Sequence, residues 1–186
     1  MRTLLLTDLH FTTTPRGLLD AQKKCVLGII KQEKPKEVII LGDVFMKRRP
    51  SARVLLAVDH TRKRVFIPHY ENEEHIINYL REAPKGYTIF GHFGYFGCLN
   101  SAGDADFGLS LSEFHNRTFL GHIHNFNQRY SETSDSVTFL GTSYTTNFSE
   151  AGKSNYYTIL EYGGVEFKEA TSGPKHIVLD HDNLDD

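Results

Sequence analysis

Short apolar runs alternate with amphipathic stretches in the first part of the chain. Residues 3–7 (TLLLT) have the length of a buried strand, and residues 18–31 have apolar positions at helical spacing. Pro35 ends that helix, and the β-branched run 37–41 (EVIIL) predicts a second strand. Strand, helix and strand are connected closely enough to form a parallel, right-handed βαβ unit.

The same alternation continues to about residue 120. Residues 51–64 have the spacing of a helix, and residues 65–67 predict a short strand. Residues 71–82 (ENEEHIINYLRE) predict an amphipathic helix that a following proline ends. Residues 87–90 and 118–120 predict two further strands. This part of the chain therefore predicts layers of helices and strands.

The last third of the chain has a different pattern, in which strands follow one another without helices. Residues 136–140, 156–162 and 165–168 predict antiparallel strands, with Gly163-Gly164 as a hairpin turn. The whole pattern predicts a mixed α/β fold in which helices flank a two-sheet β-sandwich.

Length and composition are those of one globular domain, which we expect over residues 1–170, followed by an acidic tail over residues 171–186. The net charge of −2 gives no overall attraction to nucleic acid, so DNA binding would need a local basic patch or a metal. Without a membrane-spanning run or a signal peptide pattern, and with two cysteines that predict free thiols, we expect a cytoplasmic protein. Ten histidines are a first indication of metal chemistry.

Carboxylates and imidazoles follow directly after four of the predicted strands. Glycine precedes the first of these residues at three of the four strand ends. Since ligands bind at the carboxyl ends of strands in open α/β sheets, we expect these side chains to converge. His122 and His124 are separated by one residue, so their side chains point to the same side of an extended segment. The six residues are Asp8, His10, Asp43, His92, His122 and His124.

This set of ligands indicates both the metal and the chemistry. Two carboxylates and four imidazoles, without cysteine, suit manganese, iron or zinc. Six ligands are too many for one ion that keeps positions open for a substrate, and they suit two ions that share a bridging carboxylate. Two ions about 3.5–4 Å apart can polarise a phosphoryl group and stabilise the leaving oxygen. The set therefore predicts phosphoester hydrolysis.

The ordered set resembles that of the calcineurin-like metallophosphoesterases, over most of the chain from Leu4 to about Leu160. The segments LGDVFMKRRPS, FLGHIHNFNQ and FLGTSYTTNFSEAGKSNYY are similar to the nuclease branch of this family. That branch contains the SbcD-type repair nucleases of bacteria and their relatives in tailed phages, which are subunits of recombination endonucleases. The residues most specific to the branch are Gly141, Thr142, Tyr144, Asn147, Phe148 and Glu150.

The resemblance implies a calcineurin-like phosphoesterase fold and a catalytic domain that hydrolyses DNA phosphodiester bonds as an exonuclease or endonuclease. It implies two divalent ions, with manganese expected and iron, zinc and magnesium as alternatives. The partners it implies are DNA, a coiled-coil ATPase subunit and a second copy in a homodimer, with no membrane. In the family's scheme Asp8, His10 and His124 would bind the first ion, Asp43 would bridge both ions in catalysis, and His92 and His122 would bind the second.

One motif of the family, G-N-H-D or G-N-H-E, is not found between Asp43 and His92. In the family its asparagine binds the second ion and its histidine is the general acid. Three interpretations stay open. Asp59 and His60 would serve as replacement ligand and catalytic acid, or His69 or Asn72 would reach the site from the PHYEN loop, or the segment is deleted. In the last case the protein is a weakened relative that binds DNA or a partner.

A basic stretch follows the aspartate of the second strand. Lys47, Arg48 and Arg49 predict a clamp on the DNA backbone at the mouth of the site, with a solvated loop as the alternative. A small phosphodiesterase or phosphatase that acts on nucleotides would share every metal ligand, and it is the alternative function.

Overall fold

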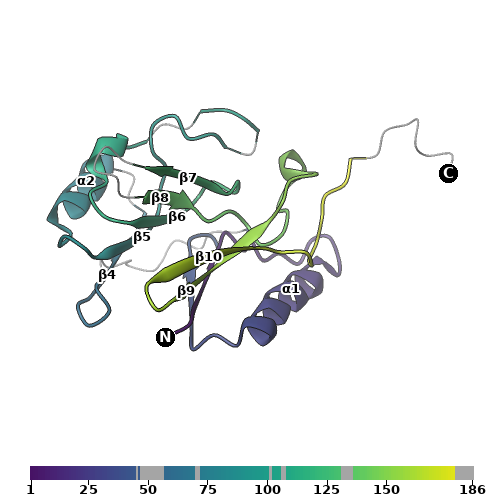
Figure 1. The fold of residues 1–186 in the computed structure, drawn as a ribbon. Coiled ribbons are helices and arrows are strands. Elements are labelled where there is room, and N and C mark those ends of the chain that lie inside the picture. Colours follow the sequence, from purple (N-terminus) through teal and green to yellow (C-terminus); the bar gives the residue numbers. More distant parts are fainter. Residues whose placement is uncertain are drawn as a thin grey trace.

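The computed structural model describes residues 1–44, 46, 57–69, 72–100, 102–105, 108–130 and 136–178. This part of the chain has a mixed α/β architecture with two sheets and two α-helices (Figure 1). In order, the elements are β1 (Thr3–Thr7), α1 (Leu18–Glu33), β2 (Glu37–Leu41), β3 (Ala57–Asp59), β4 (Arg64–Ile67), α2 (Glu73–Glu82), β5 (Thr88–His92), η1 (Leu111–Glu113), β6 (Thr118–Gly121), β7 (Asn127–Tyr130), β8 (Ser136–Phe139), η2 (Phe148–Glu150), β9 (Tyr156–Glu161) and β10 (Gly164–Glu169).

The smaller sheet has the strand order β10-β9-β1-β2. β1 pairs in parallel with β2 through the connecting helix α1, which confirms the predicted parallel βαβ unit. α1 ends at Glu33 because Lys34 adopts a left-handed conformation, with a φ of 45°, and Pro35 follows. β9 and β10 form the predicted antiparallel hairpin. Its turn lies at Tyr162 and Gly163, which both have positive φ, one residue earlier than expected.

The larger sheet has the strand order β3-β4-β5-β6-β8-β7. β4, β5, β6 and β8 are parallel to one another, so their carboxyl ends meet at one edge of the sheet. β3 and β7 are antiparallel edge strands. β8 is antiparallel to β7 and parallel to β6, so the prediction of an antiparallel strand over residues 136–140 is correct for one of its two neighbours.

The two sheets pack face to face, and one helix covers the outer face of each sheet (Figure 1). The clusters that join these layers are formed by alternate residues of the strands, since successive side chains point to opposite faces. The layer between the sheets includes Leu5, Leu41, Phe90, Phe119 and Leu140. The helix layers include Val26 and Ile29 of α1 and Ile76 and Leu80 of α2. The predicted two-sheet α/β arrangement agrees with this architecture.

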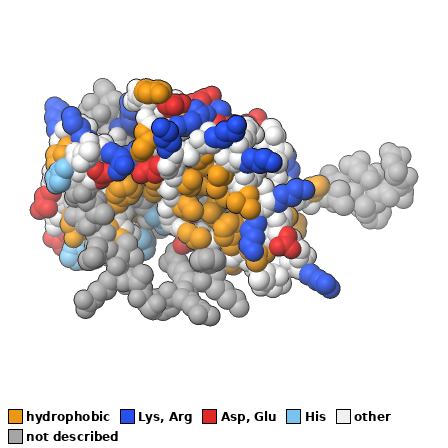
Figure 2. Space-filling view, turned by 90° about the horizontal axis from the view of Figure 1, so that it is seen from below, with side chains coloured by type: hydrophobic (Ala, Val, Ile, Leu, Met, Phe, Trp, Pro, Cys, Tyr) orange, Lys and Arg blue, Asp and Glu red, His pale blue; other side chains and the backbone are white. Residues whose placement is uncertain are grey.

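Apolar side chains remain exposed on the smaller sheet. In the described part of the chain, α1 packs on β1 and β9 and leaves Val38 and Ile40 of the edge strand β2 exposed. Figure 2 shows hydrophobic side chains grouped on the face seen there, with Lys and Arg side chains around them.

Neither described helix combines the length and the apolar character that a membrane crossing requires.

The prediction of a helix over residues 51–64 is wrong in its described part. β3 pairs antiparallel with β4, so that Val58 lies opposite Val65, and residues 60–63 form the turn. A short apolar run is compatible with a helix or a strand, and here the pairing with β4 decides. Residues 51–56 lie outside the described part. β7 has no apolar alternation, and the sequence does not predict it.

Candidate metal centre

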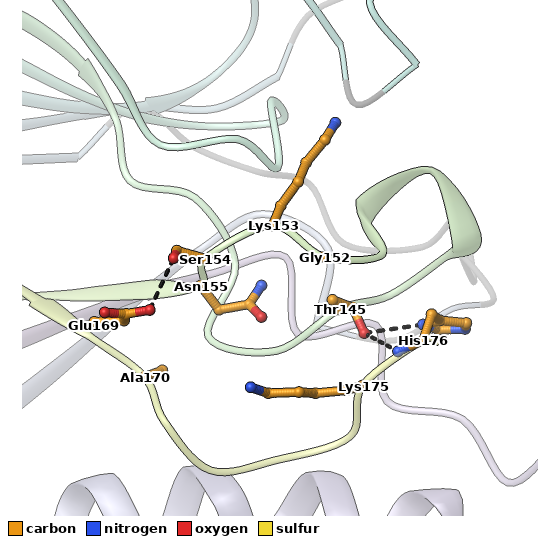
Figure 3. Close-up of a pocket in the computed structure, with 9 residues that line it drawn as sticks. All are labelled: Thr145, Gly152, Lys153, Ser154, Asn155, Glu169, Ala170, Lys175 and His176. Atoms are coloured by element: carbon orange, nitrogen blue, oxygen red, sulfur yellow. Dashed lines mark hydrogen bonds between the residues drawn. The ribbon is translucent and has the colours of Figure 1, made fainter. Parts of the chain in front are cut away.

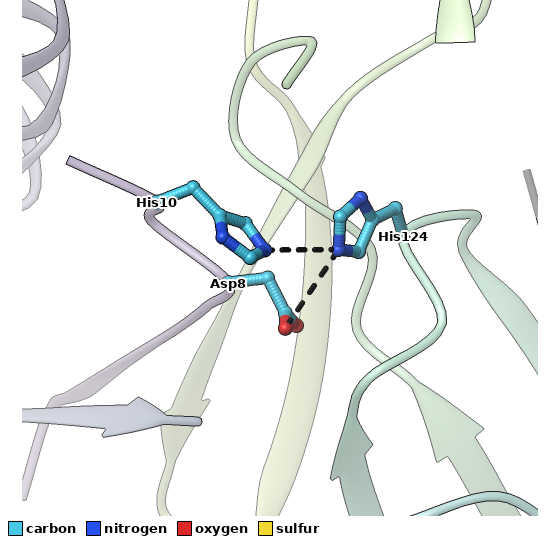
Figure 4. A group of neighbouring side chains, drawn as sticks. All are labelled: Asp8, His10 and His124. Atoms are coloured by element: carbon cyan, nitrogen blue, oxygen red, sulfur yellow. Dashed lines mark hydrogen bonds and ion pairs between the residues drawn. The ribbon is translucent and has the colours of Figure 1, made fainter. Parts of the chain in front are cut away.

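The carboxyl ends of four strands bring five of the six predicted ligands together. Asp8, His10 and His124 form a first group, in which the ligand atoms all lie within 4.8 Å of one another (Figure 4). Asp8, Asp43 and His92 form a second group within the same limit. Asp8 belongs to both groups, so the two adjoin at one buried carboxylate.

The individual distances are those of atoms that face a common point. His10 Nε2 lies 3.3 Å from His124 Nε2, and Asp8 Oδ1 lies 3.8 Å from that same nitrogen of His124. On the other side, Asp8 Oδ1 lies 3.7 Å from His92 Nδ1. His10 Nε2 lies 4.0 Å from Asp43 Oδ2, which connects the groups. Since metal–ligand bonds are about 2 Å long, two ligand atoms of one ion lie about 3–4 Å apart.

His122 lies beside the second group without belonging to it. Its ring centroid lies 5.5 Å from that of His92, and its side chain is exposed. Its backbone N–H donates to Asp8 Oδ2 at 3.0 Å, and the Thr7 hydroxyl donates to the same oxygen. Asp8 is therefore held so that Oδ1 faces the two groups. The role of His122 as a ligand of the second ion stays a prediction.

Asp8, rather than Asp43, is the residue common to both groups. Asp43 contributes to the second group and approaches the first only through His10. The backbone explains this arrangement, because the pairing of β1 with β2 continues beyond the strands. His10 N donates to Asp43 O at 2.9 Å, and Asp8 N donates to Leu41 O at 3.3 Å. The bridging role of Asp43 stays a prediction.

Several buried polar atoms of the cluster have no hydrogen-bond partner in the described part of the chain. These atoms are Asp8 Oδ1, His10 Nδ1, His92 Nδ1 and His92 Nε2. Asp8 is 1% exposed and His92 is 7% exposed. Leaving a buried charge unpaired costs several kcal/mol, so buried charges are normally paired or coordinate metals. A set of unpaired oxygen and nitrogen donors fits a divalent cation.

The electrostatics favour neutral imidazoles at two positions of the cluster. Burial, together with the neighbouring His124, lowers the pKa of His10, and burial lowers the pKa of His92. Neutral imidazole is the form that binds metals. Burial also acts on His124, but its hydrogen bond to Glu150 and the charge of Asp8 outweigh burial and raise the pKa of its imidazole.

Gly42 and Gly121 each precede a predicted ligand, and both lie so close to the His92 imidazole that there is no room for a Cβ. A Cβ at Gly42, which has a φ of +75°, would lie 1.7 Å from His92 Nδ1. A Cβ at Gly121 would lie 2.7 Å from the same atom and 2.3 Å from Thr7 Oγ1. Any side chain at either position would therefore displace the imidazole. The glycine-before-ligand pattern of the sequence thus has a steric cause.

Three of the predicted ligands have a left-handed backbone conformation. The φ angles are 48° at Asp8, 44° at His10 and 84° at His122. Such conformations cost about 1–3 kcal/mol each at residues other than glycine, and they are frequent at functional sites. The sharp change of direction after β6 therefore occurs at His122, not at the preceding glycine.

The structure places Asp59 and His60 at the other end of the larger sheet. Asp59 lies opposite Arg64 at the start of β4, about 13 Å along the sheet from the strand ends that carry the ligands. Its carboxylate forms a salt bridge of 2.9 Å with Arg62, and His60 Nδ1 lies 3.0 Å from Tyr87 OH. The interpretation in which this pair replaces the missing motif as ligand and catalytic acid is therefore wrong.

Among the described residues of this part of the chain, His69 lies beside the candidate metal cluster. It follows β4, the neighbour of β5 in the sheet, and its Nδ1 lies 3.2 Å from His92 O. Its ring centroid lies 6.5 Å from that of His92, and its side chain is exposed. Asn72, the other alternative, caps α2 by accepting from Glu74 N at 2.9 Å. His69 thus lies at the exposed edge of the second group.

A cavity of about 230 Å³ opens beside the first group. No Lys or Arg is among the described residues that line it. Lys47, Arg48 and Arg49, the predicted DNA clamp, lie outside the described residues. The lining residues are Asn100, Ala102, His122, His124, Asn147 and Ser149.

Sequence reasoning gives no role to two residues that contact the ligands. Thr7 precedes Asp8 and fixes its carboxylate, and Glu150 contacts His124 at 2.5 Å. A hydroxyl beside the first aspartate is a local signal, whereas the contact of Glu150 spans 26 residues.

Neither a scan against protein-family models nor a search of curated proteins found a match to this chain. The functional assignment therefore depends on the residues of the metal centre and their geometry.

Proposed function

We propose that this protein is a metal-dependent phosphodiesterase of the calcineurin-like type that hydrolyses DNA phosphodiester bonds in the cytoplasm. The observation that carries the proposal is the convergence of four strand ends on two adjoining groups of carboxylates and imidazoles. Asp8 Oδ1 and both ring nitrogens of His92 are buried there without a hydrogen-bond partner in the described part of the chain. The order of the motifs along the chain supports that family, and the segment from Gly141 to Glu150 supports its nuclease branch. DNA, a coiled-coil ATPase subunit and a homodimer partner belong to the same proposal.

The proposal assigns metal binding to the following residues of the chain. Asp8, His10 and His124 would hold one divalent ion, and Asp43 and His92 would hold a second with Asp8 between them. When bound, the ions would supply Lewis acidity that polarises a phosphoryl group and acidifies water. Thr7 and the backbone of His122 orient Asp8.

His69 lies beside the second group, and unlike His122 it is not among the predicted metal ligands, so it would be available there to move a proton. Its imidazole is exposed, and it contacts the backbone of His92. General-acid assistance typically contributes 10²–10⁴-fold in rate. In a protein without the G-N-H motif, we assign this assistance to His69.

A small phosphoester is the second candidate substrate, and one observation favours it. The cavity beside the first group has no Lys or Arg in its described lining. Proteins that bind the DNA backbone normally neutralise phosphates with such residues. A substrate with one phosphodiester group would need only the metal ions.

Paired hydrolysis assays test the proposal and separate the two substrates. The protein would be incubated with Mn²⁺ and either bis-p-nitrophenyl phosphate or linear DNA, and Asp8→Asn would be the matched control. We expect both substrates to be hydrolysed, and both activities to be lost with EDTA and in the control. Hydrolysis of the small ester alone would favour the second candidate. A protein that binds Mn²⁺ and hydrolyses neither substrate would overturn the proposal.

A further inference from the structure

The loop from Gly141 to Glu150 contacts both chain segments that supply the first group, the segment of Asp8 and His10 and the segment of His124. Its Tyr144 hydroxyl donates to the carbonyl oxygen of Leu9, the residue between Asp8 and His10. Its Glu150 carboxylate accepts from His124 Nδ1 at 2.5 Å. The sequence marks this loop as specific to the nuclease branch, and the proposed function leaves these contacts without a role.

Glu150 is held firmly in the orientation that meets His124. It is 2% exposed. Thr146 N donates to Oε2 at 2.6 Å, and the Thr146 hydroxyl donates to Oε1 at 2.9 Å. Asn147 Nδ2 also donates to Oε1, at 2.7 Å. A carboxylate with this many donors cannot turn away from the imidazole without losing several hydrogen bonds.

Tyr144 acts on the other side of the first group, where the backbone is strained. Asp8 and His10 both have left-handed φ angles, and the carbonyl that Tyr144 binds lies between them. The tyrosine is 2% exposed, and burial raises the pKa of its hydroxyl, which therefore stays a donor. This hydrogen bond offsets part of the cost of holding Leu9 between two strained residues.

The loop is also held on the side away from the metal centre. His176 N donates to Thr145 Oγ1 at 2.7 Å, and His176 Nδ1 lies 3.0 Å from the same oxygen. These two residues lie together at one end of a cavity of about 170 Å³ that Lys175 and Asn155 also line (Figure 3). The described first part of the predicted tail thus contacts the loop from the outside.

We infer that Glu150 and Tyr144 are positioning residues for the first metal ion. Glu150 accepts the Nδ1–H of His124, which leaves Nε2, the nitrogen that faces His10 and Asp8, with a free lone pair for the ion. Tyr144 fixes the turn that presents Asp8 and His10 to the same point. The inference rests on the metal centre of the proposed function, but it does not depend on the substrate.

Two measurements without a substrate test the inference. Isothermal titration calorimetry with Mn²⁺ gives the affinity of the first site, and ¹⁵N NMR of the metal-free protein, at a pH above the imidazole range, gives the tautomer of His124. In the wild type we expect the Nδ1–H tautomer. Glu150→Ala should weaken Mn²⁺ binding by about 10–100-fold and shift His124 toward the Nε2–H tautomer, as loss of such partners does at metal sites. Glu150→Gln, which keeps an acceptor, should have an intermediate effect.

Two further variants complete the design. Tyr144→Phe should weaken Mn²⁺ binding by about tenfold and leave the tautomer of His124 unchanged. Glu169→Gln is the matched control, because this exposed carboxylate contacts Ser154 of the adjoining segment and should change neither measurement. Mn²⁺ affinity within about twofold of wild type in folded Glu150→Gln and Glu150→Ala, with the wild-type tautomer, would overturn the inference. A wild type that binds no Mn²⁺ would also overturn it, whereas absent hydrolysis with these shifts intact would overturn only the proposed function.

Discussion

Two buried carboxylates lie at opposite ends of β1, and they differ in their hydrogen-bond and ion-pair partners. Glu33, at the end of α1, lies near Arg2, which precedes β1. Asp8 follows β1 and belongs to both groups of the candidate metal centre. Both are nearly inaccessible to solvent, since Glu33 is 5% exposed and Asp8 is 1% exposed. Their partners, not their burial, distinguish the two sites.

Glu33 is surrounded by donors and cations. Tyr157 OH donates to Oε1 at 2.7 Å, and Lys168 Nζ lies 3.0 Å from both carboxylate oxygens. The Arg2 guanidinium donates to Oε2. Burial alone would raise the pKa of Glu33, but these partners lower it to about 2. The cluster is complete without any ligand.

Asp8 has a different set of neighbours, and no Lys or Arg in the described part of the chain forms a hydrogen bond or ion pair with its carboxylate. Its Oδ2 is satisfied by Thr7 and by the backbone of His122, whereas its Oδ1 has no hydrogen-bond partner there. The imidazole nearest to Oδ1 belongs to His92, whose pKa burial lowers. The comparison teaches that a buried carboxylate with a full set of partners stabilises the fold, whereas one with an unpaired oxygen among imidazoles marks a candidate site for a cation.

The strongest way to break the comparison is to remove the charge of Asp8. Asp8→Asn should reduce Mn²⁺ affinity by more than 100-fold, because residues that only orient ligands already contribute 10–100-fold and Asp8 is common to both groups. Calorimetry and metal analysis of the purified variant measure this effect. Asp43→Asn is the matched comparison and should lose less, since Asp43 belongs to one group. Equal losses in both variants would instead support the bridging role that the family resemblance gives to Asp43.

The second prediction concerns the stability that the ion supplies. At a Mn²⁺ concentration of about 100 times Kd, binding to the folded state should stabilise it by about 2.7 kcal/mol. For a chain of this length this free energy corresponds to a rise in Tm of roughly 5–10 °C. Thermal unfolding followed by circular dichroism, with and without EDTA, measures the rise. An equal rise in Asp8→Asn would mean that Mn²⁺ binds elsewhere.

The third prediction tests the other carboxylate. Glu33→Gln should lower the free energy of unfolding at neutral pH by about 1–3 kcal/mol, because Lys168 and Tyr157 lose their charged acceptor. The expected loss is moderate because the partner side chains of Arg2 and Lys168 are 26% and 27% exposed, and solvent screens them. Urea unfolding measures the loss, and Mn²⁺ affinity should stay at the wild-type value. A loss of Mn²⁺ binding in this variant would remove the distinction between the two ends of β1.

The contribution of Glu33 should also depend on pH in a defined direction. Its pKa is about 2 in the folded protein and about 4.3 in an unfolded chain, so the folded state binds the proton less readily. The stabilisation is therefore complete above about pH 4.5 and is lost as the pH falls toward 2. The difference in unfolding free energy between wild type and Glu33→Gln should shrink over this range.

Features that depend on local pattern could be predicted from the sequence. The apolar run of β1, the helical spacing of α1 and the β-branched run of β2 predicted the parallel unit. The residues after the strands predicted that carboxylates and imidazoles would cluster, and five of the six do. These predictions succeed because each element carries its own periodicity and because parallel strands end at one edge.

Features that depend on distant contacts could not be predicted from the sequence. β3 reads as part of a helix until it pairs with β4, and β7 carries no periodic signal. Asp8 belongs to both groups, and its orientation depends on a hydrogen bond from the backbone N–H of His122, which is 114 residues away. The partners of Glu33 include Lys168, which is 135 residues away. Such contacts form only in the folded chain.

The smallest expected effect belongs to the polar pair that lies outside both clusters. The double substitution Asp59→Asn and His60→Ala should change Mn²⁺ affinity and the rate of phosphodiester hydrolysis by no more than about twofold, as is usual for surface positions. Asp59 forms an ion pair with Arg62, and its pKa is lowered by that hydrogen bond, so its acidity reflects a surface contact and not a metal site. His69→Ala is the matched comparison. It should reduce hydrolysis of DNA, which has a poor leaving group, by 10²-fold or more, and affect bis-p-nitrophenyl phosphate much less. If the double variant instead lost DNA cleavage while His69→Ala retained it, the position of the pair at the far end of the larger sheet could not explain the result, and the assignment of the proton to His69 would fail.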